Sequence, residues 1–146
     1  MTPVLLGRWQ TRLFLLGTIG ALVTAVFYFS VSPGGSVFWR VLFWVAAWGL
    51  LWDLVYIAIQ QLKWDRDWPP YAQWMAGAWE GAFLYFFIKW VGLDIGIADL
   101  EIPKVALPTD RFIPHYACVW ATTWFCSQTF MRAVFPLWRF HGGRIV

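Results

Sequence analysis

Residues 37–62 read VFWRVLFWVAAWGLLWDLVYIAIQQL, and residues 71–91 read YAQWMAGAWEGAFLYFFIKWV. Both runs are long and apolar enough to cross the hydrocarbon core of a bilayer as α-helices, which takes about 20 residues. The charged segment KWDRDWPP lies between them at residues 63–70, and proline suits the first turn of a helix. This stretch therefore predicts two antiparallel membrane helices joined by a tight turn.

The composition of the whole chain agrees with a membrane protein. Of the 146 residues, 60% are hydrophobic and 13% are charged, and the mean hydropathy is +0.58. Soluble proteins carry about 25% charged residues, so this chain cannot cover its apolar surface with polar side chains. Its 13 tryptophans also fit this class, because the indole ring favours the membrane–water interface.

Two further apolar runs predict two further helices, over about residues 13–31 and 114–135. The first run follows Arg8 and Arg12, and a secretory signal peptide is the competing interpretation. The run is long for the apolar part of a signal peptide, and no A-x-A cleavage site follows it, so we interpret it as a retained helix. The break at residues 92–112, which carries four acidic side chains, predicts a long ordered loop outside the membrane.

The chain is thus expected to be an all-α, single-domain bundle of four transmembrane helices. The cations on the side of the two termini are Arg8, Arg12, Lys63, Arg66, Arg132, Arg139 and Arg144, and those on the other side are Arg40, Lys89, Lys104 and Arg111. Cytoplasmic loops are enriched in lysine and arginine. We therefore expect both termini in the cytoplasm and an integral, multi-pass protein of the plasma (cytoplasmic) membrane.

Each helix of the central hairpin carries one narrow polar stripe. The stripes consist of Asp53, Tyr56 and Gln60 on the first helix and of Gln73, Gly77 and Glu80 on the second. At 100° per residue, each stripe covers an arc of about 60°. Closing the hairpin at its tight turn brings three pairs to one depth each, namely Gln60 with Gln73, Tyr56 with Gly77, and Asp53 with Glu80.

Asp53 and Glu80 form the candidate site. An ionisable residue inside a membrane is expensive and is a functional-site hypothesis by default. Two facing carboxylates share a proton or bind a cation, so one interpretation is a proton- or cation-binding site shaped by Tyr56, Gln60 and Gln73. The alternative is a neutral, hydrogen-bonded polar seam that fixes the register of the helices or is recognised by another subunit.

Two glycines on the second helix of the hairpin are candidates for helix packing. Gly77 and Gly81 form a small-xxx-small step, which allows the backbones of two helices to approach closely. We expect the ring of Tyr56 to fill the space over Gly77 when the hairpin closes.

His115 and Cys118 on the fourth helix are the candidate metal ligands. They are three residues apart and share one face of a helix. Structural zinc takes four protein ligands and catalytic zinc three, so this pair by itself does not define a metal site. The favoured alternative is a small, slightly polar packing face, and the presence of a metal stays open.

Trp44, Trp48 and Trp52 recur every four residues and form a stripe on one helix. Such a stripe contacts lipid or a hydrophobic pigment, or more often packs against another helix. The chain has two histidines, which does not indicate a protein that holds several haems or pigments. The identity of any cofactor is left undetermined.

The motifs of the common enzyme classes are missing from the sequence. It has no G-x-S-x-G, no H-E-x-x-H, no phosphate-binding glycine loop and no CxxC, so we lean against an enzyme. The net charge of +3 without a basic run gives no support for nucleic-acid binding.

Three functional hypotheses remain. The leading one is a non-catalytic subunit, or an assembly or stabilising factor, of a larger membrane complex, with membrane lipids and other subunits as partners. The alternative is a homo-oligomeric transporter or channel that couples to protons or cations through Asp53 and Glu80. A membrane enzyme that acts on lipid, with Asp53, Glu80 or His115 as acid–base groups, is the third.

Overall fold

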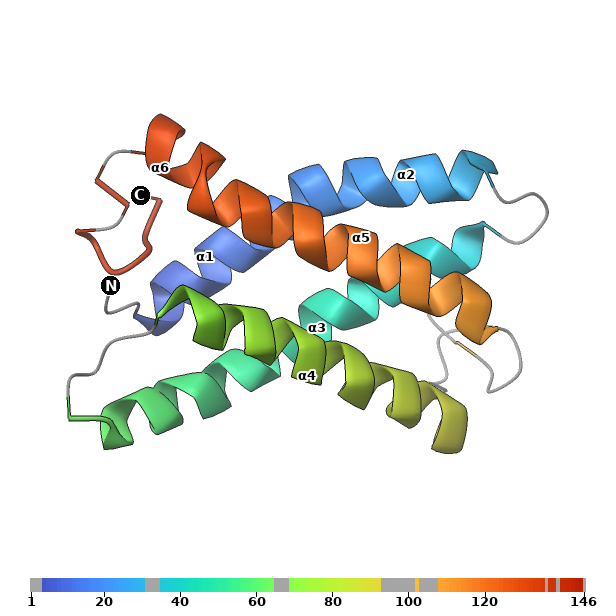
Figure 1. The fold of residues 1–146 in the computed structure, drawn as a ribbon, viewed down its shortest axis with the longest axis horizontal. Coiled ribbons are helices and arrows are strands. Elements are labelled where there is room, and N and C mark those ends of the chain that lie inside the picture. Colours follow the sequence, from blue (N-terminus) through green and yellow to red (C-terminus); the bar gives the residue numbers. More distant parts are fainter. Residues whose placement is uncertain are drawn as a thin grey trace.

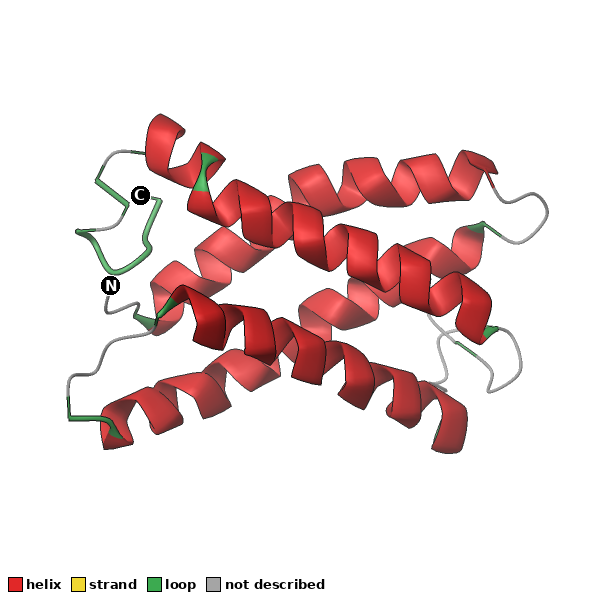
Figure 2. Cartoon of the chain, in the orientation of Figure 1, coloured by secondary structure: helices red, strands yellow, loops and turns green. Residues whose placement is uncertain are grey.

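The computed structural model describes residues 4–30, 35–64, 69–92, 102, 108–135, 137–138 and 140–145. The regular elements of these residues are helices (Figure 2), so the predicted all-α class is confirmed. In chain order they are α1 (Leu5–Leu15), a π-helical segment (Leu16–Gly20), α2 (Ala21–Ser30), α3 (Ser36–Leu62), α4 (Pro70–Trp90), α5 (Thr109–Gln128) and α6 (Phe130–Val134).

The helices form a bundle in which successive long rods run in opposite directions (Figure 1). The first rod consists of α1, the π-helical segment and α2, and the other three are α3, α4 and α5. Contacts join α1 to α3 and α5, α3 to α4, and α4 to α5. Both chain termini lie at one end of the bundle (Figure 1). We call the half that contains them the terminal half and the opposite one the distal half.

Two helices of the described residues are long and apolar enough to cross a membrane. They are the continuous rod Leu5–Ser30, of 26 residues, and α3, of 27 residues. The helices α4 and α5 have 21 and 20 residues. Half of the tight turn predicted at residues 63–70, namely residues 65–68, lies outside the described residues, and so does most of the predicted loop at 92–112.

The bundle is apolar on the outside and carries polar groups in its interior. Phe29 is 81% exposed, Leu22 66% and Met75 64%, whereas Asp53 is 2% exposed and Glu80 7%. Large exposed apolar patches mark surfaces that contact another protein or a membrane. The interior of the distal half is an apolar core, which includes Val41, Leu84, Ile88 and Phe112.

The first helix begins much earlier than the sequence predicted. It starts at Leu5 rather than near residue 13, so Arg8 and Arg12 lie inside it and do not flank it. The prediction was wrong because both arginines were interpreted as charges at a membrane boundary. They are tolerated within the helix because their side chains enter the bundle and meet polar groups there.

The fourth predicted helix also differs from the structure. Instead of 114–135, α5 covers Thr109–Gln128 and α6 follows after a break at Thr129. Pro114 lies inside α5 rather than at its start. Proline is costly in a helix interior because it lacks an N–H donor. As the sixth residue of α5, Pro114 cannot supply the hydrogen bond that a residue there normally donates to the backbone oxygen of Asp110. The expected bounds of α3 and α4 lie within one residue of the structure.

Candidate functional site: a buried arginine beside a cavity

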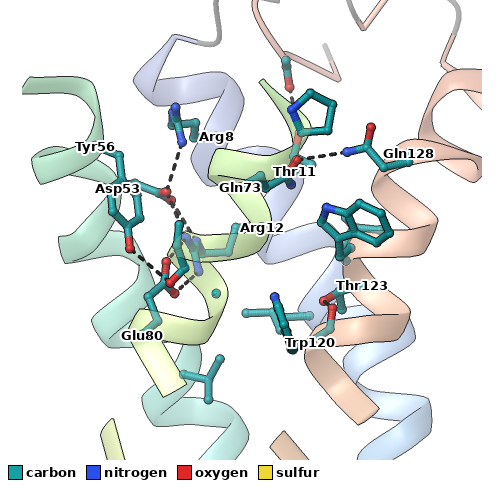
Figure 3. A pocket seen from close by; sticks show the side chains of 18 of the residues that line it. Arg8, Thr11, Arg12, Asp53, Tyr56, Gln73, Glu80, Trp120, Thr123 and Gln128 are labelled. Atoms are coloured by element: carbon teal, nitrogen blue, oxygen red, sulfur yellow. Dashed lines mark hydrogen bonds and ion pairs between the residues drawn. The ribbon is translucent and has the colours of Figure 1, made fainter. Parts of the chain in front are cut away.

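The guanidinium of Arg12 lies between the two carboxylates that the sequence singled out (Figure 3). Arg12 comes from α1, Asp53 from α3 and Glu80 from α4. The site therefore joins three helices, whereas the sequence predicted a pair of facing side chains on two. The position that we assigned to a shared proton or a small cation is occupied by an arginine side chain.

Arg12 forms a bidentate contact with each of the two carboxylates. Its Nε and Nη2 donate to Oδ2 and Oδ1 of Asp53 at 2.9 and 3.0 Å. Its Nη1 and Nη2 donate to Oε2 and Oε1 of Glu80 at 2.7 and 3.0 Å. Paired hydrogen bonds between a planar guanidinium and a carboxylate are among the strongest in proteins and are directional. This contact therefore fixes the relative positions of α1, α3 and α4.

A second arginine completes the charge balance of the cluster. Nη1 of Arg8 lies 4.0 Å from Oδ1 of Asp53, and its Nη2 donates to Oε1 of Gln60 at 3.2 Å. Two arginines then face two carboxylates, so the formal charges cancel. Buried charges require this kind of compensation, because an unpaired ion in a low-dielectric interior costs several kcal/mol.

A glycine on α3 makes room for the Arg12 side chain. A Cβ atom on Gly49 would collide with Nη1 of Arg12. The guanidinium passes the backbone of α3 at this point on its way to Asp53, one turn further along the helix. The local sequence Gly49-Leu-Leu-Trp-Asp53 thus provides both the gap and the anion.

Arg12 bridges Asp53 and Glu80, one of the predicted pairs of the hairpin stripes, and the other members of the stripes bind further groups. Gln60 accepts a hydrogen bond from Arg8, while Gln73 accepts one from Nε2 of Gln128 at 3.0 Å. Tyr56 donates to the backbone oxygen of Ala76 at 3.4 Å. Gln60 thus binds α1 and Gln73 binds α5, because four rods and not two surround the polar stripes.

The two glycines of α4 receive aromatic rings from α5 and not from α3. A Cβ atom on Gly77 would collide with the indole of Trp120, and one on Gly81 with the ring of Tyr116. Tyr116 also donates a hydrogen bond to the backbone oxygen of Gly77 at 2.6 Å. The atoms nearest to a Cβ on either glycine thus come from α5, whereas the sequence predicted that Tyr56 of α3 fills the space over Gly77.

A cavity of about 270 Å³ adjoins the Arg12 cluster in the terminal half of the bundle. Its polar wall includes Arg8, Arg12, Gln73, Gln128 and Arg132, and its apolar and aromatic wall includes Leu15, Leu16, Val45, Val119, Trp120 and Trp124. Pro70 and Arg132 are exposed and lie at the end of the bundle that carries the termini. The cavity therefore reaches the outside at that end.

The segment after α6 folds back onto α1 and forms part of the same wall. Trp138 and Gly143 line the cavity. Nε1 of Trp138 donates to the hydroxyl of Thr11 at 2.8 Å, and that hydroxyl donates to the backbone oxygen of Gly143 at 2.9 Å. The backbone N–H of Val4 also donates to the oxygen of Gly142 at 2.8 Å. The first and last described segments of the chain thus close the cavity together.

The candidate metal ligands do not share an environment. His115 is 1% exposed and its Nε2 lies 3.0 Å from the hydroxyl of Thr24, between the rings of Phe27 and Phe38. Cys118 is exposed on the outside of the bundle. Among the described residues, no group of three or more His, Cys, Asp and Glu side chains could hold a metal ion.

The stripe of Trp44, Trp48 and Trp52 is half-buried along α3. Trp48 packs edge-on against Phe83 at 5.1 Å between ring centroids, and Trp52 packs against Phe83 at 5.3 Å. Helix packing, one of the two interpretations from the sequence, therefore accounts for at least part of these two indole surfaces. Contact with a lipid or a pigment stays a prediction.

Comparison of the chain with protein-family models, with curated proteins and with solved structures finds no match.

Sequence reasoning missed the α1 and α5 sides of the site. The signal for Arg8 and Arg12 was present, because they are four residues apart and share one face of a helix. Two acids within apolar helices also call for a nearby base. Gln128 and Arg132 repeat the same four-residue spacing on the other side of the cavity, where Nη2 of Arg132 donates to Oε1 of Gln128 at 2.7 Å.

Proposed function

We propose that this chain is a multi-pass membrane protein that binds a small molecule in the cavity beside Arg12. One observation carries the proposal: a bundle with an apolar exterior surrounds a cavity of about 270 Å³ whose wall contains charged and hydrogen-bonding side chains. Ligand sites are typically concave and mostly apolar, with a few convergent polar groups that fix the ligand's orientation. The cavity has both kinds of wall.

The lengths of the helices support four membrane spans. At 1.5 Å per residue, α4 and α5 are each about 30 Å long, which matches the hydrocarbon core of a bilayer. The distribution of lysine and arginine supports a cytoplasmic location of both termini in the plasma membrane. The cavity then faces the cytoplasm, because it lies at the end of the bundle that carries the termini.

Labelling of single cysteines in membrane vesicles tests this topology. Cys118 and Cys126 are first replaced by serine, and a cysteine is then placed at Trp64 or at Val91, which are 103% and 61% exposed. A reagent that cannot cross membranes should label Trp64→Cys only from the cytoplasmic side and Val91→Cys only from the other side. Labelling of both positions from one side would contradict four spans.

A pair of neighbouring threonines provides a matched test of ligand binding. The hydroxyls of Thr122 and Thr123 both bind backbone oxygens of their own helix, but only Thr123 lines the cavity. We expect native mass spectrometry of the protein, extracted in mild detergent, to show a bound small molecule. It should be lost from Thr123→Phe, which fills the cavity, and kept in Thr122→Phe. Equal occupancy of both variants would refute the proposal.

A role as a subunit of a larger membrane complex is the second candidate, and the outer face of α4 favours it. Met75, Trp79 and Phe86 lie within an arc of about 40° and are 64%, 57% and 49% exposed. Large aromatic residues are enriched where proteins contact one another. The same mass spectrometry experiment tests this candidate, since a subunit should be released with other polypeptides in a fixed ratio.

Transport, the alternative that the sequence raised, would use the same cavity. A proton or cation carried between Asp53 and Glu80 would first have to displace the Arg12 guanidinium from four hydrogen bonds. Flux measured in vesicles should then be abolished by Glu80→Gln while the protein stays assembled. Unchanged flux in Glu80→Gln and Asp53→Asn would remove this use of the cavity.

A further inference from the structure

The carboxylate and side-chain amide oxygens that line the cavity already accept hydrogen bonds. All four carboxylate oxygens of Asp53 and Glu80 accept hydrogen bonds from Arg12 at 2.7–3.0 Å. The amide oxygen of Gln73 accepts from Gln128, and that of Gln128 accepts from Arg132. A ligand that offers mainly donors would therefore compete with existing bonds.

Two donor groups of the cavity wall are not engaged in the same way. The indole nitrogen of Trp124 is buried and has no hydrogen-bond acceptor within the described part of the chain, and Trp124 lines the cavity. A buried donor without an acceptor costs about as much as its desolvation. Arg132, which has five N–H donors, is exposed at the end of the cavity. These groups call for a ligand that supplies acceptor atoms.

The formal charge around the cavity points to a negative ligand. Arg8, Arg12 and Arg132 supply three positive charges, and Asp53 and Glu80 supply two negative charges. Among the described residues the difference is one positive charge, that of Arg132, which is exposed at the end of the cavity. A single negative charge on the ligand would complement it there.

The size and the remaining wall of the cavity define the rest of the ligand. An engineered cavity of about 150 Å³ holds a benzene molecule, so about 270 Å³ admits a ring with a short side chain. Leu15, Leu16, Val45 and Val119 form an apolar surface on the same wall. Such a surface favours an apolar body next to the acidic group.

We propose that the cavity binds a small carboxylate with an apolar body, oriented with its carboxylate toward Arg132 and the Trp124 indole and its body against Leu16 and Val119. This inference rests on the proposed function and specifies the ligand of the same site. The carboxylate has the acceptor atoms and the single negative charge that the wall lacks. It comes from either of two sources, a soluble organic acid or a fatty acid in the membrane.

Calorimetric titration of the purified full-length protein in detergent tests the charge of the ligand. Three probes share one apolar body and differ in the terminal group: phenylacetate, phenylacetamide and 2-phenylethylammonium. We expect phenylacetate to bind at least about tenfold more tightly than the amide, as is typical of hydrogen bonds to a charged group, and the ammonium ion to bind least. Equal or tighter binding of the amide or the ammonium ion, or no binding of any probe, would overturn the inference.

Substitutions that remove one donor each test the orientation. Trp124→Phe keeps a ring but removes the N–H group, and should weaken phenylacetate about tenfold while the amide changes less. Arg132→Gln should weaken phenylacetate about threefold, because exposed charge pairs contribute little. The matched controls are Trp79→Phe and Arg111→Gln, exposed residues that do not line the cavity. Losses in the controls equal to those in the cavity variants would refute the assignment.

Two further comparisons distinguish a soluble organic acid from a fatty acid, and the carboxylate inference from the broader proposal of ligand binding. Dodecanoate added in phospholipid vesicles should outcompete phenylacetate if the ligand is a fatty acid, and should fail to do so if it is a soluble acid. Loss of a co-purified molecule in Thr123→Phe, together with a preference for a neutral or cationic probe, would refute the carboxylate but leave ligand binding intact. Equal occupancy of Thr123→Phe and Thr122→Phe would refute both.

Discussion

The interiors of the two halves of the bundle differ in polarity and in packing. In the terminal half, Arg8, Arg12, Asp53 and Glu80 meet beside a cavity. In the distal half, apolar side chains such as Leu84 and Ile88 fill the interior, and the one polar pair that we noted there, Thr24 and His115, is enclosed by aromatic rings. The same four rods thus form a terminal half with a charged cluster and a cavity, and a distal half with a packed apolar core.

This difference separates what holds the bundle together from what the bundle offers to a ligand. The distal core gains stability from burial of apolar surface, which contributes about 25 cal/mol per Å². The charged cluster gains little net stability, because the cost of desolvating ions offsets much of their attraction. Its hydrogen bonds fix the register of three helices, and the cavity lies where that register is fixed.

The largest expected effect comes from breaking the charged cluster on one side. Arg12→Met leaves two buried carboxylates, Asp53 and Glu80, and one cation of the cluster, Arg8, which lies 4.0 Å from Asp53. We expect the free energy of unfolding in detergent to fall by about 3–5 kcal/mol, which is typical when one partner of a buried ion pair is removed. Thermal unfolding followed by circular dichroism measures the loss, with the exposed Arg111→Met as the control.

Neutralising the whole cluster provides a stricter version of this experiment. The quadruple variant Arg8→Met, Arg12→Met, Asp53→Asn, Glu80→Gln removes both cations and both anions of the cluster. We expect it to recover most of the stability that Arg12→Met loses, because neutral groups cost less to bury than unpaired ions. A quadruple variant as unstable as the single one would mean that the loss comes from packing and not from charge.

The next effect compares the loss of a leucine side chain in the distal half with the same loss in the terminal half. Leu84 lies in the distal core and is 2% exposed, whereas Leu16 lines the cavity and is 7% exposed. Truncation of a buried leucine to alanine costs about 2–5 kcal/mol, depending on the void that it leaves. From this range we expect Leu84→Ala to lower the free energy of unfolding by about 3 kcal/mol. Leu16→Ala should lower it clearly less, because one side of Leu16 already faces the cavity. Equal losses in thermal unfolding would contradict the contrast between the halves.

A smaller effect is expected where Arg12 passes α3. Gly49→Ala places a methyl group against the guanidinium, and overpacking of this kind costs about 1–3 kcal/mol. Gly17 has nothing within 4 Å of a built Cβ atom, so Gly17→Ala should be neutral or slightly stabilising, since alanine suits helices better than glycine. The comparison is made by thermal unfolding of the two variants. A harmless Gly49→Ala would show that the arginine has another route to Asp53.

The smallest effect concerns the polar pair of the distal half. Thr24→Val keeps the size of the side chain and removes the hydroxyl that binds Nε2 of His115. We expect a loss of about 1 kcal/mol, the typical net value of one hydrogen bond, in the same thermal assay. Thr18→Val is the control, because Thr18 is exposed and its hydroxyl binds only a backbone oxygen of its own helix among the described residues.

The hairpin of α3 and α4 was predictable from the sequence because its apolar runs end at clear signals. A charged segment with two prolines separates the runs, and the bounds of both helices agree with the structure to within one residue. The acidic positions Asp53 and Glu80 were also found, because a charge inside an apolar run stands out. These features depend on local sequence only.

The remainder of the site depends on which helices meet, and local sequence does not determine that. Arg12 looked like a boundary charge because it adjoins the apolar run at Leu13, although it lies opposite residues 41 and 68 positions away. In the same way, Gly77 and Gly81 indicated a close approach without showing that its partner is α5. The cavity has no sequence signal, since it is a space left between four rods.

The position of Arg12 in the first rod has a consequence for biosynthesis. The ribosome delivers Arg12 long before Asp53 and Glu80, its only salt-bridge partners among the described residues. If the rods span the bilayer as proposed, Arg12, the eighth residue of the 26-residue rod, costs a lone inserting helix up to about 2.5–3.5 kcal/mol, the cost of an arginine at a helix centre. The first rod would then be held at the translocon, or sit shallow in the membrane, until the hairpin that carries both acids has emerged. Membrane insertion and charge pairing would be one event.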